Sequence, residues 1–140
     1  MKLDKAMELA ARFPQSVLAT HKRDGRAQLS NVLHVPWDDG TLRISVTDDR
    51  AKTINLRRDP RCELYIRDDS FWKYLVLECE AEVSPVTASP DDAVADELVE
   101  YYRRGNGEHP NWDEYRAAMI KDKRLMLRLT PSRAYGQWFD

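Results

Sequence analysis

The sequence predicts a mainly β, α+β fold: a small antiparallel barrel of about six strands with helices at its edges. Short segments in which apolar and polar residues alternate recur from Ser16 to Thr130, and turn formers such as Asp24-Gly25 separate them. A few segments with helical spacing lie between and beside these strands. At 140 residues the chain has the length of one domain, so we expect residues 1–140 to form a single domain.

The expected strands follow this alternation in order. They cover residues 16–20, 26–35, 42–46, 62–66, 74–83 and 125–130. The first two form a hairpin, because Asp-Gly between strand-like runs is the strongest short hairpin signal. The long segment 74–83 places apolar residues on one face and glutamates on the other, which is typical of a sheet with one face toward water.

Four segments have helical patterns. They are residues 3–13, 50–58, 89–104 and 111–122. Pro14 and Asp59-Pro60 end the first two, and Ser89-Pro90 is a favourable start for the third. The acids of the third helix have no cation beside them before Arg103, so we expect a solvated face. These acids are Asp91, Asp92, Asp96, Glu97 and Glu100.

The composition excludes several functions. Lys and Arg together number 22 against 24 Asp and Glu, a net charge of −2, so no global basic field is available for nucleic acid. No apolar run approaches the roughly 20 residues of a membrane helix, and the N-terminus lacks the apolar stretch of a signal peptide. We therefore expect a cytoplasmic protein without membrane partners. Two cysteines and three histidines, widely scattered, argue against a metal site.

One segment departs from this balance. Residues 50–67 contain six basic and two acidic side chains, a local charge of about +4. Arg50 and Lys52 lie in the first turn of the expected helix, where the helix dipole disfavours cations by roughly 0.3–1 kcal/mol each. A bound anion would reverse this penalty. The two cations, the helix N-terminus and the Thr47 hydroxyl at the end of the preceding strand together form a candidate phosphate-binding site, called here the phosphate cradle. Alternatively, both cations pair with the aspartates that directly precede Arg50.

The same segment carries a family resemblance. A strand that ends in Thr47, followed by Arg-x-Lys-x-x-Asn-Leu-x-x-Asp-Pro-Arg and a further strand, resembles the flavin- and deazaflavin-dependent oxidoreductases related to pyridoxamine 5′-phosphate oxidase. The N-terminal helix, the Asp-Gly hairpin, the strand 74–83 and the closing Leu-Arg-Leu-Thr-Pro-Ser-Arg-Ala-Tyr-Gly extend it over most of the chain. The resemblance implies a split β-barrel of the FMN-binding type. Within this family, the chain is most similar to the actinobacterial branch that uses coenzyme F420. It shares the short length of that branch, and it has Arg50-Ala51-Lys52 where pyridoxamine phosphate oxidases have Ser-Arg-Lys.

The resemblance also implies site residues. Those that it assigns to cofactor binding are Ser30, Asn31, Val32, Thr47, Arg50, Lys52 and Trp72. Residues 30–32 would run along the ring system of the cofactor. Thr47, Arg50 and Lys52 would hold its phosphate. The family binds its cofactor in a groove between two subunits, so a homodimer is implied, in which Trp72 reaches the partner subunit's cofactor.

The function that follows is an oxidoreductase that transfers a hydride from reduced F420 to an unsaturated organic acceptor such as a tetrapyrrole, quinone or enone. Two alternatives remain open: an FMN-dependent reductase on the same fold, and a protein that binds or stores a flavin or deazaflavin without turnover. The sequence identifies no catalytic residue. His34 is either a proton donor in the groove or a structural histidine. Cys62 and Cys79 are expected to lie nearly opposite each other, buried and reduced.

Overall fold

The protein folds around one curled antiparallel sheet with four helices at its edges, and the structure, a computed structural model, describes residues 1–139. The strands are β1 (Gln15–His21), β2 (Ala27–Leu33), β3 (Val35–Pro36), β4 (Leu42–Thr47), β5 (Arg61–Arg67), β6 (Tyr74–Val83) and β7 (Arg124–Gln137). The helices are α1 (Leu3–Arg12), α2 (Ala51–Arg58), α3 (Ala93–Asn106) and α4 (Trp112–Lys121). The sequence prediction of a mainly β, α+β barrel with edge helices is confirmed.

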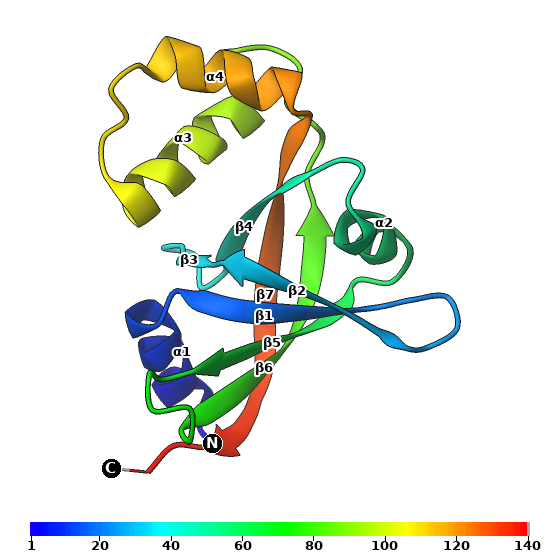
Figure 1. The fold of residues 1–140 in the computed structure, drawn as a ribbon, viewed down its shortest axis with the longest axis vertical. Coiled ribbons are helices and arrows are strands. Elements are labelled where there is room, and N and C mark those ends of the chain that lie inside the picture. The colour runs from blue at the N-terminus through cyan, green and yellow to red at the C-terminus, as the bar shows by residue number, and fades with distance from the viewer. Residues whose placement is uncertain (140) are drawn as a thin grey trace.

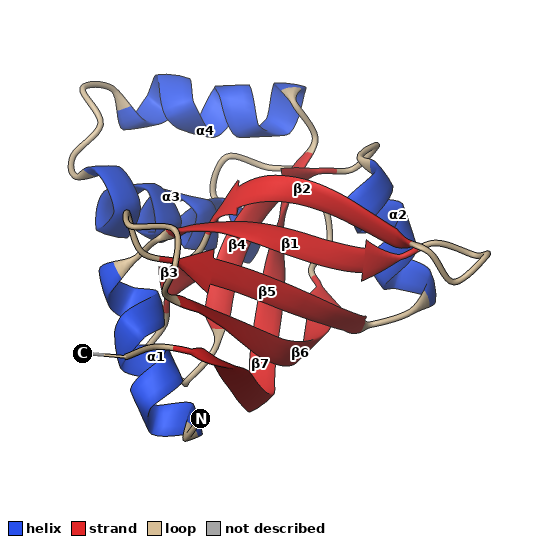
Figure 2. Ribbon diagram, turned by 60° about the horizontal axis from the view of Figure 1, so that its bottom comes forward, coloured by secondary structure: helices blue, strands red, loops and turns tan. Residues whose placement is uncertain are grey.

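The sheet has the strand order β2-β1-β5-β6-β7-β4-β3 and curls until β2 contacts β4. In Figure 1, β1 and β2 cross in front of β4 and β7, and the β1–β2 hairpin projects to one side. Figure 2 shows α1 and α2 on opposite flanks of the curled sheet, with α3 and α4 stacked at one end. The result is a half-open barrel whose open side lies between β2, β4, α2 and the α3–α4 pair.

Two strands differ from their expected lengths. The second expected strand is divided at His34. The backbone N–H of His34 still donates to the Pro14 carbonyl, in register with the β1–β2 ladder, but Pro14 has no N–H to return a bond, and β3 pairs separately with β4. The last strand is longer than expected and continues past Pro131 to Gln137. A register shift opposite Glu78 and Cys79 accommodates the proline, which has no N–H for the ladder.

The main hydrophobic core lies inside the barrel and beneath α1. The α1 residues Ala6, Leu9 and Ala10 are at most 1% exposed and pack on the inner side chains of the strands. A second, smaller core joins α3 and α4 to β7 through Leu98, Tyr115 and Met126. The α3–α4 pair is therefore a separate packing unit that sits on the barrel, and no helix among residues 1–139 is long and apolar enough to span a bilayer.

Cys62 and Cys79 are directly opposite each other on β5 and β6, as expected, and both thiols are free and buried. Burial raises the pKa of both thiols, that of Cys79 to about 12. Neither thiol is therefore ionised near neutral pH, and both behave as small core residues.

Candidate functional site

A groove of about 550 Å³ opens between the barrel and the α3–α4 pair. It is bounded by β2, β4, the start of α2, the helices α3 and α4, and the first residue of β7. The groove brings together five of the seven residues that the sequence assigns to cofactor binding: Asn31, Val32, Thr47, Arg50 and Lys52. These residues come from three elements that the curled sheet places on its open side.

One end of the groove is the beginning of α2. Arg50 is its N-cap residue, no side chain caps the helix, and its first turn contains no acid. The N–H groups of that turn consequently have no side-chain acceptor, and an anion bound here would satisfy them and the helix dipole together. Arg50 is exposed and Lys52 is half-buried, so both are available to such an anion.

The aspartates before Arg50 form no ion pair with these cations within the described residues. Asp48 pairs with Arg57 at 2.6 Å, and neither residue lines the groove. Asp49 accepts a hydrogen bond from the Thr47 hydroxyl at 2.9 Å. Within residues 1–139, neither Arg50 nor Lys52 forms an ion pair. The alternative in which both cations pair with the preceding aspartates is therefore wrong.

The pKa of Lys52 is perturbed. Burial lowers the pKa of its ammonium group, and repulsion from Arg50 and Arg124 lowers it further. Arg124 is the first residue of β7, lies opposite Thr47 in the β4–β7 ladder and lines the groove. Arg124 was not predicted from the sequence, because only the long-range pairing of β4 with β7 brings it beside the α2 segment.

Two buried polar residues fix α2 in this position. The Thr53 hydroxyl donates to the Thr47 carbonyl at 2.8 Å, and the Asn55 amide donates to the Thr20 hydroxyl at 3.1 Å. Both residues are nearly inaccessible to solvent. The asparagine of the Arg-x-Lys-x-x-Asn pattern therefore ties the helix to β1, and so holds the cationic turn at the mouth of the barrel.

The α3 and α4 wall of the groove is aromatic. Tyr101 and Tyr102 of α3 and Tyr115 and Met119 of α4 line it. The Tyr101 hydroxyl donates to the Leu33 carbonyl of β2 at 2.7 Å, which joins α3 to the opposite wall. Burial raises the pKa of Tyr101, and that of Tyr115 to about 12, so both phenols are neutral at physiological pH. The sequence did not assign the α3 tyrosines to the site.

Ser30 and Trp72 do not line this groove. Ser30 lies opposite Leu18 on the β1–β2 ladder, and its buried hydroxyl oxygen has no hydrogen-bond partner among residues 1–139. Trp72 lies in the turn between β5 and β6, is 69% exposed and packs edge-on against Phe71, with ring centroids 5.1 Å apart. The predicted contact of Trp72 with the cofactor of a partner subunit stays a prediction.

His34 is structural, and the alternative of a proton donor in the groove is wrong. It is fully buried; Nε2 lies 2.8 Å from the Ala10 carbonyl and Nδ1 lies 2.7 Å from the Ser16 hydroxyl. Because a carbonyl only accepts, Nε2 carries the proton and Nδ1 accepts from Ser16. The imidazole thus links α1 to β1, and its pKa is lowered by desolvation, opposed by the bond to Ala10.

This burial makes stability depend on pH. The unfolded chain protonates His34 near its ordinary pKa of 6.5, whereas the folded chain does so only at lower pH. The contribution of His34 to the free energy of unfolding is therefore constant above pH 6.5 and falls below it by up to about 1.4 kcal/mol per pH unit. We expect urea denaturation to show this fall in the wild type and a smaller fall in His34→Gln. Parallel pH profiles for the two proteins would contradict the assignment.

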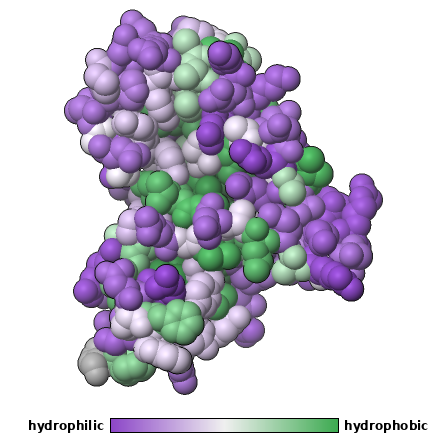
Figure 3. Space-filling model, viewed as in Figure 1, coloured by the Kyte–Doolittle hydropathy of each residue, from purple (hydrophilic) through white to green (hydrophobic). Residues whose placement is uncertain are grey.

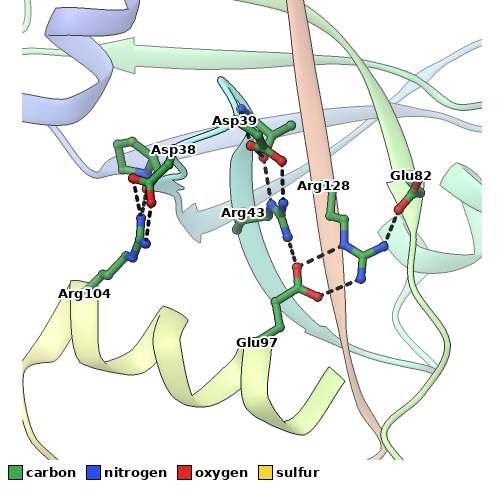
Figure 4. A network of polar contacts seen from close by, with 9 residues as sticks. Asp38, Asp39, Arg43, Glu82, Glu97, Arg104 and Arg128 are labelled. Carbon is green, nitrogen blue, oxygen red and sulfur yellow. Dashed lines mark hydrogen bonds and ion pairs between the residues drawn. The ribbon is translucent and has the colours of Figure 1, made fainter. Parts of the chain in front are cut away.

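Ion pairs hold α3 on the barrel (Figure 4). Glu97 lies between Arg43 of β4 and Arg128 of β7: its carboxylate accepts from Arg128 at 2.7 and 3.0 Å and also from Arg43. The side chains of Glu97 and Arg43 are each only 9% exposed. At the other end of α3, Arg104 pairs with Asp38 at 3.1 Å. The aromatic wall of the groove is therefore positioned by buried charge.

The expected solvated face of this helix is wrong at two positions. Glu97 points into the ion-pair network, and Asp92 is the N-cap residue, whose side chain accepts from the Ala95 N–H at 2.8 Å. The capping carboxylate lies after the expected Ser89-Pro90 start, so α3 begins at Ala93. Hydrogen bonds to backbone N–H groups lower the pKa of Asp92 to about 2, despite the opposing effect of desolvation.

Solved structures share this fold. The conserved hypothetical protein Rv2991 from Mycobacterium tuberculosis is 21% identical with a TM-score of 0.74, and the match covers 98% of this chain and 84% of that one. A protein described as F420 reductase is 24% identical with a TM-score of 0.64, covering 91% and 94%. HutZ, the heme storage protein from Vibrio cholerae, is 16% identical with a TM-score of 0.69, covering 97% and 95%.

The fold, the order of its motifs and the groove agree with a match to a family profile. The profile described as pyridoxamine 5′-phosphate oxidase matches residues 3–138, nearly the whole chain. Its span includes every helix and strand of the structure and all the residues that line the groove. The chain belongs to the pyridoxamine 5′-phosphate oxidase family, as the sequence resemblance had indicated.

Proposed function

We propose that the protein is an oxidoreductase that binds reduced coenzyme F420 in the groove and passes a hydride to an unsaturated organic acceptor. One observation carries the proposal: the groove is amphipathic. Its α2 wall presents Arg50, Lys52 and an uncapped helix start, and its α3–α4 wall presents tyrosines and Met119. A ligand with an anionic group and a flat ring system complements both walls.

The chain's own residues would bind and orient. Arg50 and Lys52 would hold the phosphate by charge-assisted hydrogen bonds, and Asn31 and Val32 would lie along the ring from β2. The α3 and α4 side chains would exclude water from the reacting carbons. When bound, F420 supplies the hydride, so positioning of donor and acceptor is the main contribution that the protein makes to catalysis.

F420 is preferred to FMN on two grounds. The sequence has Arg50-Ala51-Lys52 where pyridoxamine phosphate oxidases have Ser-Arg-Lys, and an F420 reductase is among the proteins with the same fold. FMN-dependent reduction on the same fold remains the alternative. A storage protein without turnover is the other, and a heme storage protein also shares the fold.

The deciding experiment titrates the apo-protein with F420 and FMN side by side. We expect tighter binding of F420, followed in stopped flow by oxidation of bound reduced F420 on mixing with a quinone, an enone or a tetrapyrrole. A yellow protein that retains FMN through purification would overturn the preference for F420. Tight F420 binding with no oxidation by any acceptor would favour storage.

We also propose a homodimer. The outward side of β2 exposes Leu29 by 63% and Leu33 by 46%, and Figure 3 shows apolar side chains grouped across the middle of this face. Asn31 lies between these leucines and lines the groove, so a partner on this face would border the cofactor. We expect light scattering to give twice the 16.3 kDa mass of the chain at micromolar concentration. A monomer would remove the shared-groove arrangement and, with it, the proposed role of Trp72.

A further inference from the structure

The groove contains a cation that neither the sequence pattern nor the proposed cradle uses. Arg124 lines the groove beside Thr47, its neighbour across the β4–β7 ladder. The Nε atom of Arg124 is buried and has no hydrogen-bond partner among residues 1–139, and the side chain forms no ion pair with any of them. A buried N–H without an acceptor is unfavourable, so the structure retains an unsatisfied group at this position.

Arg124 belongs to a cluster with Arg50 and Lys52. All three residues line the groove, and the positive charges of Arg50 and Arg124 both act on Lys52 and lower its pKa further than burial alone. Asp49 is the acid beside this cluster; it is exposed and accepts a hydrogen bond from the Thr47 hydroxyl. No acid lines the groove among the described residues. Three like charges therefore line the groove, with the exposed Asp49 near Arg50 outside it and no ion pair to any of the three among the described residues.

We propose that Arg124 is a third ligand of the anion in this groove, and that Arg50, Lys52 and Arg124 together select a ligand with at least two negative charges at its phosphorylated end. A guanidinium group offers several fixed N–H donors, so Arg124 can satisfy its buried Nε and bind an anionic oxygen at the same time. A single negative charge would leave two of the three cations uncompensated, whereas a dianion or two adjacent anionic groups would balance most of the cluster.

This inference deepens the proposed function, because two cofactors supply the required charge differently. The phosphate monoester of FMN is close to dianionic at neutral pH. F420 instead combines a phosphodiester with carboxylates on its tail. Inorganic pyrophosphate has the same concentrated charge without a ring, and riboflavin has the ring without phosphate. Together these four probes separate recognition of charge from recognition of the ring.

The experiment compares the wild type with Arg124→Gln and Lys121→Gln by isothermal titration calorimetry. Lys121 is an exposed cation at the end of α4 that does not line the groove, so its variant makes the same charge change elsewhere. We expect Arg124→Gln to weaken binding of pyrophosphate, and of whichever cofactor the wild type binds, at least tenfold. Riboflavin affinity should be unchanged, and Lys121→Gln should match the wild type.

Stability provides a second readout. Without ligand, Arg124→Gln should melt no lower than the wild type, because the substitution relieves repulsion within the cluster; an arginine with a purely structural role would lower the melting temperature. Arg124→Lys keeps the charge and should retain most of the pyrophosphate affinity. Equal affinities of the wild type and Arg124→Gln for every phosphorylated probe would overturn the inference.

The failures of the two proposals are distinguishable. If neither F420 nor FMN binds but pyrophosphate binds through Arg124, the proposed function fails and the three-cation site stands. If F420 binds and Arg124→Gln has no effect, the proposed function stands and the three-cation site fails. A wild type that binds no phosphorylated probe would overturn both.

Discussion

Replacing Lys52 by alanine is expected to weaken cofactor binding by about 1.5–3 kcal/mol, a rise in Kd of roughly 12- to 150-fold. This is the range for a hydrogen bond to a charged group, and the geometry supports it. Lys52 is half-buried at the uncapped start of α2, lines the groove and has no ion-pair partner within residues 1–139. Its amino group is therefore available to a ligand, and fluorescence titration with F420 and FMN measures the change.

The loss should be confined to binding. Removal of Lys52 relieves its repulsion with Arg50 and Arg124 and breaks no ion pair within the described chain, so the melting temperature of the apo-protein should not fall. Arg57→Ala is the matched control: it removes a cation from the same helix, but one that pairs with Asp48 outside the groove, and its Kd should stay within about twofold. Unchanged affinity of Lys52→Ala for both cofactors would place the anion site elsewhere.

The cationic turn was predictable because its signal is local. Arg50 and Lys52 lie two residues apart, and their conflict with the helix dipole can be recognised without knowing the fold. Arg124 and the α3 tyrosines carry no such local signal. Arg124 reaches the groove only through its pairing with Thr47, and Tyr101 only through its hydrogen bond to Leu33, and both contacts join distant parts of the chain.

The strand predictions show the same division. Period-two alternation located each long strand, but not the break at His34, where the opposite residue on β1, Pro14, has no N–H to continue the ladder. The acidic pattern of α3 predicted solvent exposure for Glu97, and that prediction is wrong for a related reason. The helix surface that carries Glu97 is covered by Arg43 and Arg128 from two strands, and the helix sequence contains no sign of either.

Replacing Glu97 by alanine is expected to lower the free energy of unfolding by about 3–5 kcal/mol. Glu97 is the acceptor that Arg43 and Arg128 share, and both Glu97 and Arg43 are 9% exposed in their side chains. Truncation would leave Arg43 buried with only the more exposed Asp39, at 2.8 Å, as its ion-pair partner. The cost comes mainly from this uncompensated charge rather than from lost contact area. Urea denaturation followed by circular dichroism measures it.

The same substitution tests whether the α3–α4 pair shapes the groove. Glu97 ties α3 to β4 and β7, and the next turn of α3 carries Tyr101 and Tyr102 into the groove wall. Glu97→Ala should therefore also weaken cofactor binding at temperatures where the protein remains folded. Glu100→Ala is the control on the same helix: its pairs with Arg103 and Arg104 are at the surface and are worth about 0.2–1 kcal/mol. Equal stabilities of the two variants would show that the buried network does not hold the helix pair. If Glu97→Ala were as stable as the wild type but bound the cofactor more weakly, Glu97 would be assigned to ligand binding instead.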